Sequence, residues 1–397
     1  MNNINTNHWR QLPFIDVITT VSKNKGIKKT EYKESGKYPV IDQGQKFISA
    51  YSDNTELVGE STPKIIFGDH TRVIKFVDFL AVYGNDGVKI LKPKEGIEAK
   101  FLYYQISNFD IPNTGYNRHF KFLTEKTFQV PKVQIQQKIA LILSTVDDAI
   151  QKTNQIIQKA ENLKVGLMHE LLLKGIGHKK FKKTKLGVIP EEWDIFSLQE
   201  LINSGLITSH LDGNHGELYP KAPEFTNEGI PYISANSLHS SRVDFTGSKF
   251  LSEFRAKQFK KGVALDGDVL FAHNATVGPV ALLETGYPFI ILSTSLTYYR
   301  CNISKLSPRY LLNYMQSEKF KNQYQRIMSQ TTRNQVPITA QRTLLHVIPP
   351  FDEQNKIADI LSAVDVDLLK NNAEKDKLIN LKNGLMQDIF SQKVQIN

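Results

Sequence analysis

Two short stretches of the chain combine polar, basic and aromatic side chains, the residue types that can hydrogen-bond and stack. Residues 114–121 read TGYNRHFK, and residues 331–335 read TTRNQ. Arg, Asn, Gln, Lys and Thr side chains hydrogen-bond to base edges and phosphates, so both stretches are candidate nucleic-acid contacts. The candidates are Tyr116, Asn117, Arg118, His119 and Lys121 in the first stretch, and Thr332, Arg333, Asn334 and Gln335 in the second.

Further loops carry similar side chains. They contribute the candidates Arg72 and Lys75 close to His70, Asn214 within residues 212–216, and His273 and Asn274 within residues 273–276. The alternative for every one of these clusters is a solvated surface loop that contacts nothing. Five lysines lie between positions 179 and 185, and they form either a phosphate-contacting segment or a flexible basic linker.

A search for catalytic motifs gives no candidate. The sequence lacks a phosphate-binding GxxxxGK[ST] loop, a glycine-rich dinucleotide turn, and an Asn/Asp-Pro-Pro-aromatic motif. His210 and His215 lie close together but have no further zinc ligands near them, and Cys301 follows a strand-like run as a core or inert thiol. We therefore expect no catalytic residue and no metal in this chain.

The composition favours a polyanionic partner. The 397 residues carry a formal net charge of +10, and residues 130–190 hold eleven lysines against four acids. Neutralised phosphates release counterions, which favours a basic protein on DNA, although a merely basic protein would show the same balance. No apolar run of membrane-spanning length and no signal peptide is visible, and one cysteine argues against a disulfide framework. We expect a cytoplasmic protein without a membrane partner.

An internal repeat organises the chain. Residues 130–175 and 348–393 align without gaps at an offset of 218, with 19 identities in 46 positions. A second similarity opens each half, because Trp9 and Trp193 are followed by apolar residues at the same spacings. The chain therefore reads as two half-units that share their edges and differ in their middles.

The repeated segments are predicted helices. Each opens with a proline, Pro131 or Pro349, and apolar residues then recur at steps of three and four. Forty residues in a helix extend about 60 Å, and such a rod cannot bury its apolar stripe alone. We expect the two copies to pack on each other. Before each helix, short β-rich runs separated by Gly, Asp and Asn predict α+β domains with twisted, mostly antiparallel sheets.

The layout of the chain resembles that of a known family, the specificity subunits of type I restriction–modification systems. The resemblance is carried by GVIPEEW at residues 187–193, GDVLF at 267–271, YPV at 38–40 with Gly44, and the Pro-x-x-x-x-Gln-x-Lys-Ile-Ala pattern at both helix starts. It covers nearly the whole chain. It implies target-recognition domains at 1–130 and 189–347, antiparallel spacer helices at 131–176 and 348–393, and a basic linker at 177–188.

The resemblance also implies a function. Each variable domain would read one half of a split double-stranded DNA target in the major groove, and the helix length would set the gap between the halves. Two methyltransferase subunits and two restriction–translocation subunits would join the chain, and the complex would act as an endodeoxyribonuclease and an adenine-N6 DNA methyltransferase. S-adenosylmethionine, ATP and Mg would belong to those partners, so the chain itself would hold no cofactor and would not be an enzyme.

Residues shared by both repeats are the expected partner contacts. Gln136 and Lys138 in the first repeat are identical to Gln354 and Lys356 in the second, and identical residues at equivalent positions would let two copies of one partner bind alike. Asp147 and Asp365 are also expected to face a partner. Two other functions stay open: a scaffold or adaptor with two non-DNA binding domains, and a self-sufficient DNA-modifying enzyme.

Overall fold

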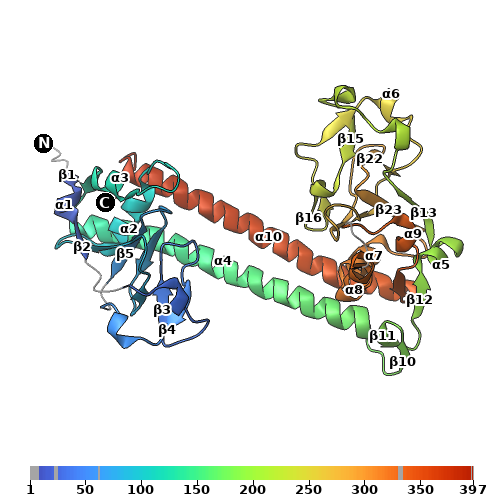
Figure 1. Ribbon diagram of the computed structural model, residues 1–397, viewed down its shortest axis with the longest axis horizontal. Helices are drawn as coiled ribbons and strands as arrows, with labels where there is room; N and C mark the ends of the chain where they lie inside the picture. Colours follow the sequence, from blue (N-terminus) through green and yellow to red (C-terminus); the bar gives the residue numbers. More distant parts are fainter. Residues whose placement is uncertain (1–8, 22–25, 61–62, 330–333, 395, 397) are drawn as a thin grey trace, which may run out of the picture. The chain divides into compact units, whose positions relative to one another are not determined.

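The computed structural model describes residues 9–21, 26–60, 63–329, 334–394 and 396, and the chain divides into two compact units (Figure 1). Unit 1 comprises Met1–Ile156 and Asn371–Asn397, and unit 2 comprises Ile157–Lys370. Two long helices each contribute one half to each unit: α4, Val133–Lys174, and α10, Phe351–Phe390. Both repeats are therefore helical as predicted, and each helix begins two residues after its proline, where the missing N–H costs nothing.

The two helices pack on each other in an antiparallel sense within each unit. In unit 1, Ile139 and Leu143 near the start of α4 share a core cluster with Met386 and Ile389 near the end of α10. In unit 2 the halves are exchanged, because the end of α4 shares a core cluster with the start of α10. The predicted packing of the two repeats on each other is thus confirmed, but the apolar stripes are buried only in part, because Ile142, Ile156 and Leu163 of the first stripe remain exposed.

Two ion pairs connect the helices, and they are the same contact made twice. Lys382 Nζ lies 2.7 Å from Asp147 Oδ1 in unit 1, and Lys164 Nζ lies 2.6 Å from Asp365 Oδ1 in unit 2. Asp147 and Asp365 are equivalent in the repeat, and so are the two lysines. Each carboxylate therefore joins α4 to α10 while its side chain stays about one third exposed, at 34% for Asp147 and 35% for Asp365, and contact with a partner subunit stays a prediction.

Unit 1 has two main sheets. A four-stranded antiparallel sheet has the order β2-β8-β5-β6, and a three-stranded sheet has the order β4-β3-β7, in which β3 and β7 are parallel. β1 pairs with β9, the strand that leads into α4. The elements are β1 Arg10–Pro13, α1 Phe14–Val17, β2 Ile18–Val21, β3 Tyr38–Ile41, β4 Ala50–Ser52, β5 Lys64–Gly68, β6 Ile74–Val77, β7 Val82–Tyr83, β8 Val88–Pro93, α2 Ala99–Asn108, α3 Phe120–Thr124 and β9 Thr127–Val130.

Unit 2 repeats this plan with additions. The strands β13-β23-β20-β21 correspond in order and direction to β2-β8-β5-β6, and β17 and β16 extend that sheet to six. A five-stranded sheet, β14-β18-β15-β22-β19, again contains a parallel pair, β15 and β22. β12 pairs with β24, the strand that leads into α10. The two units therefore share their edges and differ in their middles, as the spacing of the repeats predicted.

The elements of unit 2 have the following bounds. The strands are β10 Phe181–Thr184, β11 Gly187–Pro190, β12 Asp194–Ser197, β13 Ile207–Asp212, β14 Phe225–Thr226, β15 Ile230–Ile233, β16 Leu238–His239, β17 Arg242–Val243, β18 Lys249–Leu251, β19 Val263–Ala264, β20 Val269–Ala272, β21 Val280–Leu282, β22 Ile290–Leu292, β23 Leu296–Cys301 and β24 Leu345–Ile348. The helices are α5 Leu198–Asn203, α6 Glu253–Ala256, α7 Pro308–Gln316, α8 Glu318–Met328 and α9 Ile338–Gln341. Short 3-10 helices lie at Lys29–Glu31 (η1) and Thr55–Leu57 (η2) in unit 1, and at Gly216–Leu218, Ala222–Glu224 and Ala235–Ser237 in unit 2.

The basic segment that the sequence marked as a possible flexible linker is an ordered hairpin. β10 pairs with β11 in antiparallel register, and Ile189 on β11 is buried in the core of unit 2. Strand alternation explains the division of its side chains, because burying Ile189 directs its neighbour Val188 outward. Within the part of the chain that the structure describes, no helix is long and apolar enough to cross a membrane.

Candidate nucleic-acid interface

In unit 1, two loops that are distant in sequence are joined into one surface. The loop between β5 and β6 begins at Asp69, whose backbone carbonyl accepts the N–H of His119 at 2.8 Å. The Asp69 carboxylate accepts the N–H of Phe120 at 2.9 Å. These bonds tie the hairpin loop to residues 114–121, so the two clusters of candidate residues in this unit adjoin each other.

The exposed part of this surface is polar and aromatic. Tyr116 is 81% exposed, and its ring stacks on His70 with centroids 4.7 Å apart and planes 12° apart. Asn117 and Arg118 are exposed beside it in the chain, as is Lys121 at the start of α3. Aromatic faces, amide groups and cationic side chains together can stack on bases and hydrogen-bond to their edges and phosphates.

Arg72 holds the hairpin loop in shape. Its φ of 61° lies in the left-handed region, and its half-buried guanidinium donates to the carbonyl of Ile111 at 2.9 Å. A non-glycine residue in this conformation needs support from its surroundings, which this hydrogen bond supplies. Arg72 therefore connects the β5–β6 loop to the segment that precedes the exposed Tyr116 surface.

Two candidates in unit 1 are buried, which corrects the prediction that they are surface contacts. His119 has no exposed surface, and its Nδ1 lies 3.0 Å from the carbonyl oxygen of Asp69. Lys75 donates to the carbonyls of Asp42 and Lys46 at 2.8 and 2.6 Å, and burial lowers its pKa despite the opposing charge of Asp42. Strand alternation could have shown this, because Lys75 lies two residues from the buried Val77 on β6.

Unit 2 joins the equivalent pair of loops. The loop between β20 and β21 contacts the segment before α9, where Ala275 N–H donates to the Asn334 carbonyl at 3.1 Å. The Asn334 side-chain amide donates back to the Ala275 carbonyl at 2.9 Å, and Asn274 forms a β-bridge with Gln335. Ala275 has a φ of 62°, so both hairpin loops contain a non-glycine residue in the left-handed region.

The remaining candidates of unit 2 differ in their exposure. Thr332 and Arg333 lie outside the described residues. Asn214 is exposed and lines a separate pocket of about 270 Å³ with His215, Lys260 and Lys261. His273, the first residue after β20, is buried rather than a surface contact, and burial lowers its pKa.

His210 and His215, the close pair in the sequence that lacked further zinc ligands, are buried in unit 2. His210 Nε2 lies 3.2 Å from Gln341 Oε1, and His215 Nε2 lies 2.7 Å from the Leu292 carbonyl oxygen. Burial lowers the pKa of His210 to about 4. Among the residues that the structure describes, no group of three His, Cys, Asp or Glu side chains is placed to hold a metal ion.

The repeated glutamines are buried, so the prediction that they are exposed partner contacts is wrong. Gln136 Oε1 accepts the N–H of Glu98, the residue that caps α2, at 2.8 Å, and its Nε2 donates at 2.9 Å to the carbonyl of the proline that precedes α4. Gln354 repeats this with the N–H of Ser307, the cap of α7, at 2.9 Å. Each glutamine thus fastens a long helix to the short helix of its own unit.

In each unit, exposed helix residues that the two repeats share are a second set of candidate contacts. Lys138 and Lys356 are exposed as predicted. Two apolar pairs have matched exposures that sequence reasoning missed: Ile142 and Ile360 at 38% and 39%, and Leu163 and Leu381 at 55% and 51%. The packing of α4 on α10 does not explain why both repeats keep an apolar residue at these exposed positions. We call these residues the repeat patch of each unit: Lys138, Ile142 and Leu381 in unit 1, and Lys356, Ile360 and Leu163 in unit 2. Each is a candidate protein-binding surface.

Comparisons with known proteins agree with this architecture. The sequence model of the family described as type I restriction modification DNA specificity domain matches residues 9–162 and 190–380. The type I restriction enzyme MjaVIII specificity subunit of Methanocaldococcus jannaschii is 21% identical over 98% of this chain and 93% of its own. The putative MjaX specificity subunit of the same organism is 29% identical over 56% of this chain and 51% of its own.

Solved structures show the same fold. The crystal structure of the type I restriction–modification system S subunit from M. genitalium matches 100% of this chain and 99% of its own with a TM-score of 0.64 at 16% identity. A second structure, from a study of complex assembly and conformational transition of the type I R-M system, matches 96% of this chain and 97% of its own with a TM-score of 0.54 at 16% identity. With two copies of the family's domain covering most of its length, the chain belongs to the specificity subunits of type I restriction–modification systems.

Proposed function

We propose that the chain reads a bipartite double-stranded DNA target, with unit 1 reading one half-site and unit 2 the other. One observation carries this proposal. Each unit joins the same hairpin loop to the same pre-helical segment, yet the side chains at these places differ: Tyr116, Asn117 and Arg118 in unit 1, and Asn274, Asn334 and Gln335 in unit 2. One scaffold carrying two different sets of donors and acceptors suits two different base sequences.

The charge of the chain supports contact with the DNA backbone. The net charge of +10 favours phosphate binding, and phosphate contacts would fix the position of each unit while base contacts give the preference. Affinity would then fall steeply as the salt concentration rises. Binding that is insensitive to salt would favour a scaffold or adaptor protein instead.

The catalytic activities belong to partner subunits in this proposal. The chain would dock two methyltransferase and two restriction–translocation subunits, and S-adenosylmethionine, ATP and Mg would be bound by them. The repeat patch suits the methyltransferase subunits, because the same side chains recur at equivalent positions of α4 and α10. Two copies of one protein can use such positions in the same way.

A domain exchange tests whether each unit recognises its own half-site. Residues 194–347 are replaced by the corresponding segment of another specificity subunit, and the chimera is combined with its methyltransferase partner. Selection from a randomised DNA library should then give a target in which only one half has changed. A chimera that changes both halves, or a wild-type complex that selects no sequence, would contradict the proposal.

A second experiment tests docking. Leu163→Ser and Leu381→Ser place a polar group at equivalent positions of the repeat patch, where both side chains are more than half exposed. We expect each variant to keep its fold and to lose one of two bound methyltransferase copies, and the double variant to lose both. Leu141→Ser is the matched control, because Leu141 is exposed on α4 but the second repeat has Asp359 at that position.

A further inference from the structure

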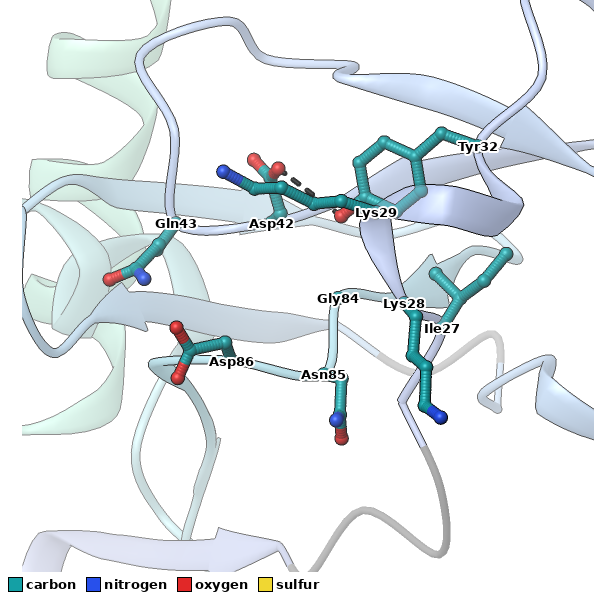
Figure 2. A pocket seen from close by; sticks show the side chains of 9 residues that line it. All are labelled: Ile27, Lys28, Lys29, Tyr32, Asp42, Gln43, Gly84, Asn85 and Asp86. Atoms are coloured by element: carbon teal, nitrogen blue, oxygen red, sulfur yellow. Dashed lines mark hydrogen bonds between the residues drawn. The ribbon is translucent and has the colours of Figure 1, made fainter.

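A pocket of about 250 Å³ opens in unit 1 at a place that the sequence did not indicate (Figure 2). The parallel strands β3 and β7 end at the same edge, so the residues that follow them, 42–43 and 84–86, form two walls. Residues 27–32, which include η1, form the third. Figure 2 shows Gln43, Asp42 and Lys29 along one side of the pocket and Asp86, Asn85 and Gly84 along the other.

One wall of the pocket contains a carboxylate that accepts three hydrogen bonds. Asp42 accepts the Tyr32 hydroxyl at 3.2 Å and the Gly44 N–H at 2.8 Å, and it also accepts the Ser49 hydroxyl. Burial alone would raise the pKa of Asp42, but these hydrogen bonds and the nearby charge of Lys75 outweigh burial and lower it. Asp42 is therefore an ionised structural anchor that is already engaged by three donors.

Gln43 connects the pocket to the candidate DNA-contacting surface. Its Oε1 accepts the N–H of His70 at 3.1 Å, and its backbone carbonyl accepts the Thr71 hydroxyl at 2.6 Å. Its amide group fits against Gly87, where an added Cβ would lie 2.4 Å from the side-chain nitrogen and oxygen. The Gln43 side chain is thus held between Gly87 and the β5–β6 loop, whose His70 stacks on Tyr116.

Two groups at the pocket have hydrogen-bonding capacity to spare. Among the hydrogen bonds of the described residues, none engages the Gln43 Nε2 donor or the exposed Asp86 carboxylate. Lys29 adds an exposed ammonium group at the rim. The pocket therefore offers one fixed amide donor, one carboxylate acceptor and one lysine side chain, a combination that matches a base and its phosphate rather than an apolar ligand.

We propose that this pocket reads one adenine of the half-site recognised by unit 1. Adenine presents an acceptor, N7, and an amine donor, N6, side by side on its major-groove edge. Gln43 Nε2 donates to N7, Asp86 accepts from the N6 amine, and Lys29 contacts a neighbouring phosphate. Guanine presents two acceptors at the same edge, which the Asp86 carboxylate repels. The inference rests on the proposed function, because it places one base contact within the target read by unit 1.

Two isosteric substitutions test the assignment. Asp86→Asn removes the charge and half of the acceptor capacity, and Gln43→Glu keeps the acceptor for the His70 N–H while replacing the donor with a second acceptor. Asp78→Asn is the matched control, because Asp78 is an exposed carboxylate of unit 1 that does not line the pocket. Each variant is assembled with the methyltransferase partner and used to select from a DNA library randomised across the target.

We expect Asp86→Asn and Gln43→Glu to reduce the preference for adenine at the same single position of one half-site, each by about 5- to 100-fold. The other half-site and the Asp78→Asn variant should keep the wild-type preference. Lys29→Gln should weaken all sequences alike and reduce the salt dependence by about one phosphate contact.

Two results would overturn the inference while leaving the proposed function intact. In the first, the wild-type complex selects a bipartite target and both pocket variants select the same target with unchanged preference. In the second, both variants weaken binding equally for every sequence, which would make the pocket a backbone contact only. A wild-type complex that selects no sequence would instead remove the proposed function itself.

Discussion

Replacing Glu353 should loosen the junction where α4 ends in unit 2. This half-buried carboxylate accepts the Trp193 indole N–H at 2.9 Å and the Ile176 N–H at 2.8 Å, and it lies 2.9 Å from His178 Nε2. One side chain near the start of α10 thus holds the turn after α4 and the tryptophan that opens the second half. At the equivalent position of unit 1 the repeat has Ile135, so this anchor exists once.

The cost of Glu353→Ala follows from the burial of its partners. Trp193 has no exposed surface, so its indole N–H would lose its acceptor with no access to water, at a cost of about 1–3 kcal/mol. The contacts to Ile176 and His178 lie nearer water and add about 1 kcal/mol. We therefore expect unit 2 to lose about 3 kcal/mol of unfolding free energy, which lowers a urea midpoint by about 1–2 M.

Trp193 itself provides the assay. The chain has two tryptophans, so a Trp9→Phe background leaves Trp193 as the sole indole reporter, and it lies in the core of unit 2. Glu353→Gln keeps an acceptor for the indole and should recover more than half of the loss. Asp352→Ala, an exposed acid in the same helical turn, is the control. Ordinary surface substitutions change the unfolding free energy by about 0.5 kcal/mol or less. If the unfolding free energies of Glu353→Ala and Asp352→Ala differ by no more than this, Glu353 does not anchor the junction.

Three further predictions follow from the two units. Gln354→Leu should lower the unfolding free energy of unit 2 by about 2 kcal/mol, because the buried Ser307 N–H loses its acceptor. Urea unfolding measures this loss, and Lys356→Ala, a change at an exposed residue, is the control that should alter stability little. A double-mutant cycle of Asp147→Asn and Lys382→Met should give a coupling free energy of about 0.5–1 kcal/mol, because both side chains remain partly exposed. A coupling of zero would show that the ion pair contributes nothing to stability. Burial lowers the pKa of both His210 and His346 to about 4, so the unfolded chain binds protons first, and unit 2 should lose stability as pH falls from about 6.5 to about 4. Urea midpoints that stay constant over this range would contradict the prediction.

Strand alternation and helical periodicity account for what sequence reasoning anticipated correctly. The repeat at an offset of 218 predicted both long helices, and the steps of three and four predicted an apolar stripe, part of which the helices bury against each other. Both properties depend on residues a few positions apart, so the sequence contains them directly. The strand-rich middles likewise predicted a mixed fold with mostly antiparallel sheets.

Individual site residues were predicted less well, because their burial depends on distant segments. Lys75 and His119 are residue types common in surface contacts. In the fold, however, Lys75 hydrogen-bonds to the carbonyls of Asp42 and Lys46, and His119 contacts the carbonyl of Asp69. Gln136 and Gln354 look like exposed helix residues until α2 and α7 place backbone N–H groups over them. No local pattern reports which segment will cover a given side chain.

The sequence by itself determined that this chain has two halves with one plan, that each half ends in a long amphipathic helix, and that its charge suits a polyanion. The tertiary structure alone decided which candidate residues share a surface. It joined the β5–β6 loop to residues 114–121 and the β20–β21 loop to residues 334–336, and it opened the Gln43–Asp86 pocket where two parallel strands end. The physical reason is that periodicity is written in neighbouring residues, whereas a binding surface is made by backbone hydrogen bonds between segments that the sequence separates.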